Sequence, residues 1–173
     1  CEGVSRSYAE CDVLSDRLRR GLAERCGLRK GDRVAIAAPN GLEFFTAYWA
    51  TMKSGGVVAP VNTRLGTEEL AALLDRSEAE ILVVHAAHRG ALMKAAAGCR
   101  RMRHVVGIGF AEGTTPSYEA LTAEGGGWDH HPPIAEEDVG ILLFTSGTTG
   151  LPKGAVMRHG DLLFNNRLAI YAH

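Results

Sequence analysis

The amino-acid sequence predicts an α/β protein: a mainly parallel sheet of βαβ units flanked by helices, ending in a strand–loop–strand hairpin and a helix. Two observations lead to this prediction. Short apolar runs alternate with longer segments of helical periodicity through residues 7–108, which is the order that βαβ units produce. From residue 139 the order changes to an apolar run, a glycine-rich loop, a second run and a helical segment.

The first helix is expected to begin at Ser7, because Ser7 and Glu10 have the spacing of a capping box. Gly27 can end this helix. Between these ends, apolar residues recur at helical spacing at Cys11, Leu14, Leu18 and Leu22. Alternating apolar residues then predict a strand over 33–38, which the turn sequence at 39–41 ends.

The second helix is predicted to begin at Asn40, with Glu43 completing the cap, and to end at Gly55 and Gly56. One face of this helix carries large apolar residues, namely Leu42, Phe45, Trp49 and Met52. A stripe of aromatic residues and methionine at helical spacing is typical of a protein core, so we assign this face to the core.

Two further βαβ units follow. Residues 57–61 form a predicted buried strand, and Thr67 is expected to cap a helix that buries Leu70, Leu73 and Leu74. The remaining predicted elements of this part are strands at 81–84 and 105–108 and a helix at 86–97. Residues 109–137, rich in Gly, Thr and Pro, predict an irregular connector with a short helical piece at 118–121.

The hairpin carries the most informative stretch of the chain, LLFTSGTTGLPKG at 142–154. Predicted strands at 139–144 and 155–158 flank it, and Asp161 is expected to cap a final helix at 162–172. Hydroxyls and unhindered backbone N–H groups can surround an anion, and a lysine adds a point charge. The stretch therefore predicts a phosphate loop, and the alternative is a glycine-rich turn with a solvated lysine.

Other loop motifs fail on spacing. A Walker loop beginning at Gly147 needs Gly-Lys-Ser/Thr at 152–154, where the chain has Pro-Lys-Gly. A dinucleotide fingerprint beginning at Gly107 needs glycine at position 112, which is glutamate. A nucleophile elbow around Ser146 needs glycine two residues before and after it, where phenylalanine and threonine stand. Ser146 is therefore interpreted as a hydrogen-bonding hydroxyl.

The longer string LLFTSGTTGLPKGAVMRHGDLL resembles the phosphate-binding signature of the acyl-adenylate-forming superfamily, with agreement from 145 to 154. That superfamily includes acyl-CoA synthetases, adenylation domains of peptide synthetases and luciferases. Residues 47–84 are similar to the segment that the family places before its loop, and the resemblance is weakest over 90–136. Members of the family are much longer, so the resemblance implies that residues 1–173 form a partial N-terminal (AMP-binding) domain, truncated at both ends and part of a larger N-terminal domain.

The resemblance also implies the site. ATP would be held by its β- and γ-phosphates, with Mg²⁺ sharing the neutralisation of charge. The implied contacts are the hydroxyls of Thr145, Ser146, Thr148 and Thr149, the backbone of Gly147 and Gly150, and the ammonium group of Lys153. No catalytic residue and no metal ligand is assigned within 1–173, because the family's adenine site and catalytic lysine lie downstream.

The implied function is that of an ATP-dependent acyl-CoA synthetase, which converts a carboxylic acid and ATP to an acyl-adenylate and then to a thioester with CoA. The string GTEELAALLDRSEAEILVV favours fatty-acyl or medium-chain CoA ligases. Two alternatives remain open: an adenylation domain that loads a carrier protein, and a non-catalytic nucleotide-binding remnant. The chain alone is not expected to turn over substrate.

Composition excludes several other classes. A net charge of −1 offers no basic footprint for nucleic acid. No apolar run approaches the ~20 residues that span a bilayer, and no leader pattern is present, which predicts a cytoplasmic protein. The cysteines lack metal-type or redox-type spacing. The partners that the family resemblance implies are a carboxylic acid, ATP and CoA.

Overall fold

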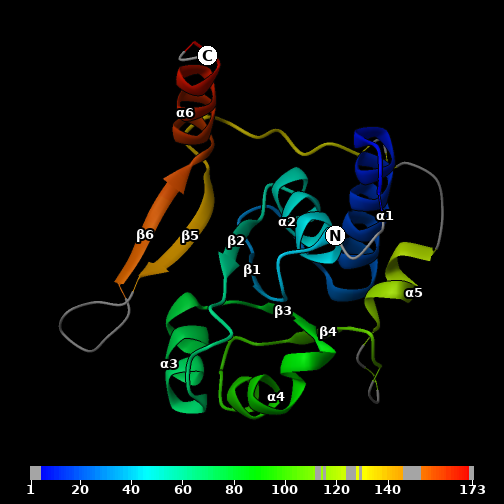
Figure 1. Ribbon diagram of the computed structural model, residues 1–173, viewed down its shortest axis with the longest axis vertical. Coiled ribbons are helices and arrows are strands. Elements are labelled where there is room, and N and C mark those ends of the chain that lie inside the picture. The colour runs from blue at the N-terminus through cyan, green and yellow to red at the C-terminus, as the bar shows by residue number, and fades with distance from the viewer. Residues whose placement is uncertain are drawn as a thin grey trace.

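A computed structural model describes residues 5–111, 114, 116–123, 128, 130–145 and 153–171, with the backbone alone for 169–171. It contains a single sheet with helices on both sides (Figure 1). The helices are α1 (Tyr8–Cys26), α2 (Leu42–Lys53), α3 (Thr67–Ser77), α4 (Arg89–Ala97), α5 (Tyr118–Ala123) and α6 (His159–Tyr171), with the 3₁₀ turn η1 (Ala86–His88) before α4. The strands are β1 (Arg33–Ala37), β2 (Val57–Pro60), β3 (Ile81–His85), β4 (His104–Ile108), β5 (Val139–Thr145) and β6 (Lys153–Arg158).

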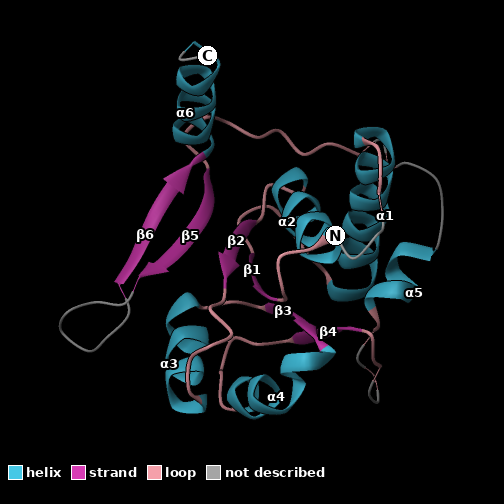
Figure 2. Cartoon of the chain, viewed as in Figure 1, coloured by secondary structure: helices cyan, strands magenta, loops and turns pink. Residues whose placement is uncertain are grey.

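The sheet has the strand order β4-β3-β1-β2-β5-β6 (Figure 2). Neighbours from β4 to β5 pair in parallel, and β6 alone pairs antiparallel, with β5. The predicted α/β class with a mainly parallel sheet is therefore confirmed. After β2 the chain returns to the other side of β1 to form β3, so the strand order reverses between β1 and β3. Ligands of open α/β sheets bind at the carboxyl ends of the strands near such a reversal.

The core has two layers, one on each face of the sheet. Within β1, Val34 and Ile36 join the layer under α1, α2 and α5, whereas Ala35 and Ala37 join the layer under α3 and α4. All four side chains are fully buried. Burial on both faces explains why the central strands are nearly continuous apolar runs, as parallel sheets require.

The helix caps confirm one prediction and correct two. Ser7 and Glu10 form the expected capping box, with the Ser7 N–H donating to the Glu10 carboxylate at 2.7 Å. Asn40 is not a cap, because α2 begins at Leu42 and its N-cap is the glycine at 41, one residue later than predicted, which makes no side-chain cap bond. Thr67 is likewise the first residue of its helix, behind Gly66.

The start of α6 differs from its prediction in the same way. The helix begins at His159, so Asp161 lies in its first turn and not at its cap. The Asp161 carboxylate accepts a hydrogen bond from the Arg158 N–H at 2.9 Å. The acidic side chain thus satisfies the free backbone donor from inside the helix, as the glutamate of a capping box does.

The aromatic stripe of α2 is not in the core. Phe45 and Trp49 are 38% and 42% exposed, while Met52 is buried as predicted. The residues of α2 that are buried are instead mostly small: Thr46, Ala47, Ala50, Thr51 and Met52. Small side chains allow α2 to lie close to the sheet and to α1, so the large rings are left at the rim, where Tyr48 and Trp49 make an edge-to-face contact at 5.6 Å.

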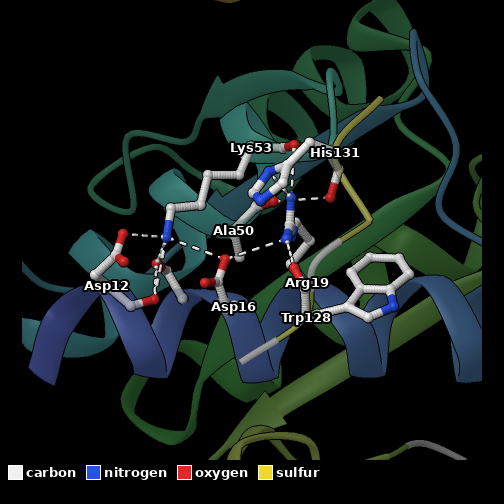
Figure 3. Close-up of polar contacts among 9 residues, drawn as sticks. Asp12, Asp16, Arg19, Ala50, Lys53, Trp128 and His131 are labelled. Atoms are coloured by element: carbon white, nitrogen blue, oxygen red, sulfur yellow. Dashed lines mark hydrogen bonds and ion pairs between the residues drawn. The ribbon is translucent and has the colours of Figure 1, made fainter. Parts of the chain in front are cut away.

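A buried arginine ties the connector to the first two helices. Arg19 of α1 is fully buried, and its guanidinium donates to the backbone carbonyls of Lys53 and Trp128 (Figure 3). It also contacts His131 Nδ1 at 3.2 Å, pairs with Asp16 at 3.3 Å and lies 4.9 Å from the Trp128 ring centroid. Trp128 and His131 of the 109–137 segment are therefore held against α1 and α2.

Candidate functional site

The β5–β6 hairpin places the two described residues of the predicted phosphate loop opposite each other. Thr145 and Lys153 form the last cross-strand pair before the turn. Because directly opposed residues of an antiparallel pair project on the same face, the Thr145 hydroxyl and the Lys153 ammonium group emerge together at the mouth of the loop. Both residues are exposed. The other predicted contacts, Ser146, Gly147, Thr148, Thr149 and Gly150, lie outside the described residues.

Gly154 allows the hairpin to close tightly next to Lys153. It pairs with Phe144, and a β-carbon placed on Gly154 would lie 3.1 Å from Leu142 Cδ1 and 3.3 Å from Phe144 Cε1. Any larger residue would press on these side chains. The absence of a side chain at Gly154 therefore leaves room for Leu142 and Phe144 next to the pair formed by Thr145 and Lys153.

The base of the hairpin is held by an ion pair. Lys30 Nζ lies 2.6 Å from the Asp138 carboxylate, which also accepts a hydrogen bond from the Ala135 N–H at 2.7 Å. These contacts, with that of Lys30 first, lower the pKa of Asp138. The Asp138 carbonyl in turn accepts from the N–H of His159, the first residue of α6. One aspartate thus joins the connector, the start of β5 and the start of α6.

His159 is a second constraint at this base. Its Nε2 atom is buried and has no hydrogen-bond partner among the described residues. Met52 packs in the same space, since a β-carbon placed on Gly140 would lie 3.3 Å from both His159 Nε2 and Met52 Sδ. Burial lowers the pKa of His159, and nearby Lys30 adds to this effect while Asp138 opposes it.

A pH-dependent stability follows from the lowered pKa of His159. Its folded pKa is below the unfolded value near 6.5, so its contribution is present above about pH 6.5 and is lost as the pH falls. We expect the free energy of unfolding in urea to fall between about pH 7 and about pH 5, and His159→Gln to reduce this slope. Some slope should remain, because burial also lowers the pKa of His104. An identical slope in His159→Gln and the control His88→Gln would refute the assignment.

A cleft of about 550 Å³ opens beside the hairpin at the carboxyl ends of β1, β2, β3 and β5. The segment after β1 contributes Pro39 and Asn40, and the segment after β2 contributes Asn62 and Arg64. Phe144 of β5 closes the side nearest to the loop. The cleft therefore lies where the strand order reverses, which is the position that ligands of open α/β sheets occupy.

The structure brings together some residues that the sequence did not single out. Lys30, Asp138 and His159 lie far apart in the chain, and neither spacing nor composition marks them as a group. Arg158 is exposed and flanks the returning strand as a solvated charge. No cluster of His, Cys, Asp and Glu that could hold a metal ion is found among the described residues.

The fold and the hairpin define a doubly wound α/β protein with a glycine- and hydroxyl-rich loop on its last parallel strand. The family model described as AMP-binding enzyme matches residues 1–173. The chain therefore belongs to the AMP-binding enzyme family, and the predicted family resemblance is confirmed. Its relatives include proteins named as a CoA synthase and a CoA ligase.

Two relatives illustrate the similarity in sequence. The chain is 36% identical over 165 residues to a feruloyl-CoA synthase from Amycolatopsis sp, covering 94% of this chain and 30% of that protein. It is 31% identical over 171 residues to a crotonobetaine/carnitine–CoA ligase from Salmonella paratyphi A, covering 95% and 33%. The chain thus spans about a third of the length of these relatives.

Solved structures show the same fold. A protein described as a long-chain-fatty-acid CoA ligase, from Rhodopseudomonas palustris, superposes with a TM-score of 0.88 at 24% identity, covering 99% of this chain and 42% of that one. A fatty acyl CoA synthetase from Mycobacterium tuberculosis superposes with a TM-score of 0.77 at 25% identity, covering 90% and 30%. Among the described residues, no helix has the length and apolarity needed to cross a membrane.

Proposed function

We propose that this chain is the N-terminal part of an ATP-dependent acyl-CoA synthetase and that its β5–β6 hairpin binds the phosphates of ATP. The observation that carries the proposal is the hairpin itself, where the family's signature connects the paired residues Thr145 and Lys153. Residues 1–173 would then be a partial AMP-binding domain, truncated at both ends, within which 109–137 is the irregular connector. Membership of the family and the names of the relatives support this reading.

The chemistry of adenylation suits such a loop. A carboxylate attacks the α-phosphorus of ATP while pyrophosphate leaves with a high negative charge, so the protein must position the triphosphate and neutralise it. Lys153 provides a positive charge and Thr145 a hydroxyl on the same face of the hairpin. We propose that Ser146, Gly147, Thr148, Thr149 and Gly150 complete these contacts.

Mg²⁺ is expected to be held mainly by the phosphates. This ion keeps several waters and takes few protein ligands when it binds with a nucleotide. Bound in this way, the ion would neutralise part of the charge of the leaving pyrophosphate.

The thiol acceptor and the cellular location are part of the proposal. The relatives are named as CoA ligases, which favours CoA over a carrier-protein thiol. A cytoplasmic location is expected because Cys11, Cys26 and Cys99 are free thiols, which suits a reducing compartment.

The decisive experiment is carboxylate-dependent exchange of labelled pyrophosphate into ATP by the complete protein. We expect exchange with at least one acid from a panel of ferulate, carnitine and fatty acids of increasing length, followed by CoA-dependent release of AMP. Exchange without use of CoA would favour a domain that loads a carrier protein. No exchange with any acid, with the fold intact by circular dichroism, would favour a non-catalytic remnant and contradict the proposal.

A further inference from the structure

A second cleft, separate from the hairpin, lies between α1, α5 and the first residues of β4. Its volume is about 440 Å³, within the range of small-molecule sites. Because β4 begins at His104, this cleft lies at the amino ends of the parallel strands, whereas the loop follows the carboxyl end of β5. It belongs neither to the phosphate loop nor to the cleft beside it.

Arginines dominate the described lining of this cleft. Arg17, Arg20 and Arg25 come from α1. Arg20 is three residues and Arg25 eight residues after Arg17, and these spacings place the side chains on one face of a helix. Arg103 approaches from the segment before β4. Among the described lining residues, Glu24 is the one carboxylate, so the four arginines and this glutamate leave a net charge of +3.

The acidic partners present do not neutralise this cluster. Glu24 lies 2.8 Å from the Arg20 side chain, and Arg103 pairs with Asp32 outside the cleft at 3.3 Å. Arg17 and Arg25 form no ion pair with any carboxylate among the described residues. Two guanidinium groups on the same helix face therefore lack a counter-charge within the described part of the chain.

Two observations show that the local environment favours an anion. The Nε atom of Arg17 is buried and has no hydrogen-bond partner among the described residues, although buried donors are nearly always satisfied. The charge of Arg103 also helps burial to lower the pKa of His104, which is the direction that a positive surrounding produces. A bound oxyanion would accept from the guanidinium forks and remove the mutual repulsion.

One wall of the cleft is apolar. Leu121 of α5 packs directly on Gly21 of α1, since a β-carbon placed on Gly21 would lie 2.9 Å from the Leu121 side chain. Ala120 and Pro116 extend this wall. A ligand that fits both parts carries a phosphate for the arginines and an apolar or ring-shaped body for the wall.

We propose that this cleft binds a small phosphomonoester, with Arg17 and Arg25 as the principal contacts to the phosphate. The site is independent of the proposed phosphate loop. It would allow a phosphorylated metabolite to bind at the edge of the sheet opposite to the ATP phosphates.

The test uses the complete protein with selectively labelled histidine and the probe phenyl phosphate, with phenol as the uncharged comparison. His104 lines the cleft, so its imidazole NMR signals should shift saturably with phenyl phosphate but not with phenol. Arg25→Gln, an exposed position that leaves the helix intact, and Arg17→Gln should each weaken binding about tenfold, which corresponds to the loss of one charge-assisted contact. Arg76→Gln on α3, also exposed, is the matched control and should stay within about twofold.

The outcomes separate this site from the loop. Lys153→Ala should leave the titration of the His104 signals with phenyl phosphate unchanged. The outcome for this cleft therefore does not depend on whether the hairpin loop binds ATP. Binding should weaken as salt is raised, because the cleft is open to solvent. The proposal is overturned if His104 shows no saturable shift below about 10 mM phenyl phosphate, or if Arg17→Gln and Arg25→Gln both bind as tightly as Arg76→Gln.

Discussion

Replacing Lys153 with alanine in the complete enzyme is expected to raise the ATP concentration needed for half-maximal pyrophosphate exchange and to slow adenylation. Lys153 is paired with Thr145 at the mouth of the loop. In the proposed site this pairing would place its ammonium group next to the phosphates of ATP. A hydrogen bond to a charged group contributes about 1.5–3 kcal/mol, so kcat/KM for ATP should fall about 10- to 100-fold. The measurement is isotope exchange over a range of ATP concentrations at saturating carboxylic acid.

The control for this variant is Arg158→Ala. Arg158 lies at the opposite end of the same strand, is exposed, and its backbone N–H remains free to donate to Asp161. Its removal changes the net charge by the same amount without affecting the loop, so exchange kinetics should stay within about twofold. If the two variants have the same kinetics, Lys153 is a solvated turn residue and the proposed contact is wrong.

The order of elements could be predicted from the sequence because each element is set by local patterns. Strands such as 33–37 and 81–85 are apolar on both faces, and the glycines at 27 and 55 have the positive φ angles that end a helix or form a turn. The predicted connector also contains its short helix, now α5. These features depend on near neighbours in the chain, which is why composition and spacing were sufficient.

The predictions that failed depend on contacts distant in sequence. The stripe of Phe45 and Trp49 has the spacing of a core face, but the close approach of α2 to the sheet needs small residues on the buried side. The candidate site also has one part that the sequence indicates and one part that depends on contacts between distant residues. The sequence alone indicated the loop, whereas the ion pair of Lys30 with Asp138 and the burial of His159 exist only once β5 and α6 are in place.

Arg19 is the clearest example of a residue whose role depends on contacts distant in sequence. Its replacement is also expected to have the largest effect on stability. In the sequence it stands among other arginines of an amphipathic helix and resembles a solvated charge. In the structure it is fully buried, and burial lowers its pKa while Asp16 opposes that effect. A guanidinium remains charged at neutral pH, so Asp16 and the carbonyls of Lys53 and Trp128 lose a charged donor when Arg19 is replaced. Removing one member of a buried ion pair costs about 3–5 kcal/mol of stability.

Arg19→Met is therefore expected to reduce the free energy of unfolding by about 3 kcal/mol, measured by urea denaturation. Methionine fills much of the same volume but cannot donate to the carbonyls of Lys53 and Trp128. Arg25→Gln, an exposed site on the same helix, should change stability by no more than about 0.5 kcal/mol. A loss in Arg19→Met as small as in Arg25→Gln would show that water replaces the lost donors.

A double-mutant cycle with Trp128→Ala separates a specific clamp from a simple packing defect. Alanine at 128 keeps the backbone carbonyl that accepts from Arg19 and removes only the ring beside the guanidinium. A contact between a cation and an aromatic ring in a partly buried setting contributes about 1 kcal/mol, so the two single effects should exceed the double effect by that amount. Strict additivity would mean that the ring contributes nothing through Arg19. The segment before β5 would then be held by other contacts, which include the hydrogen bond of Arg19 to the Trp128 carbonyl, its contact with His131 and the ion pair of Lys30 with Asp138.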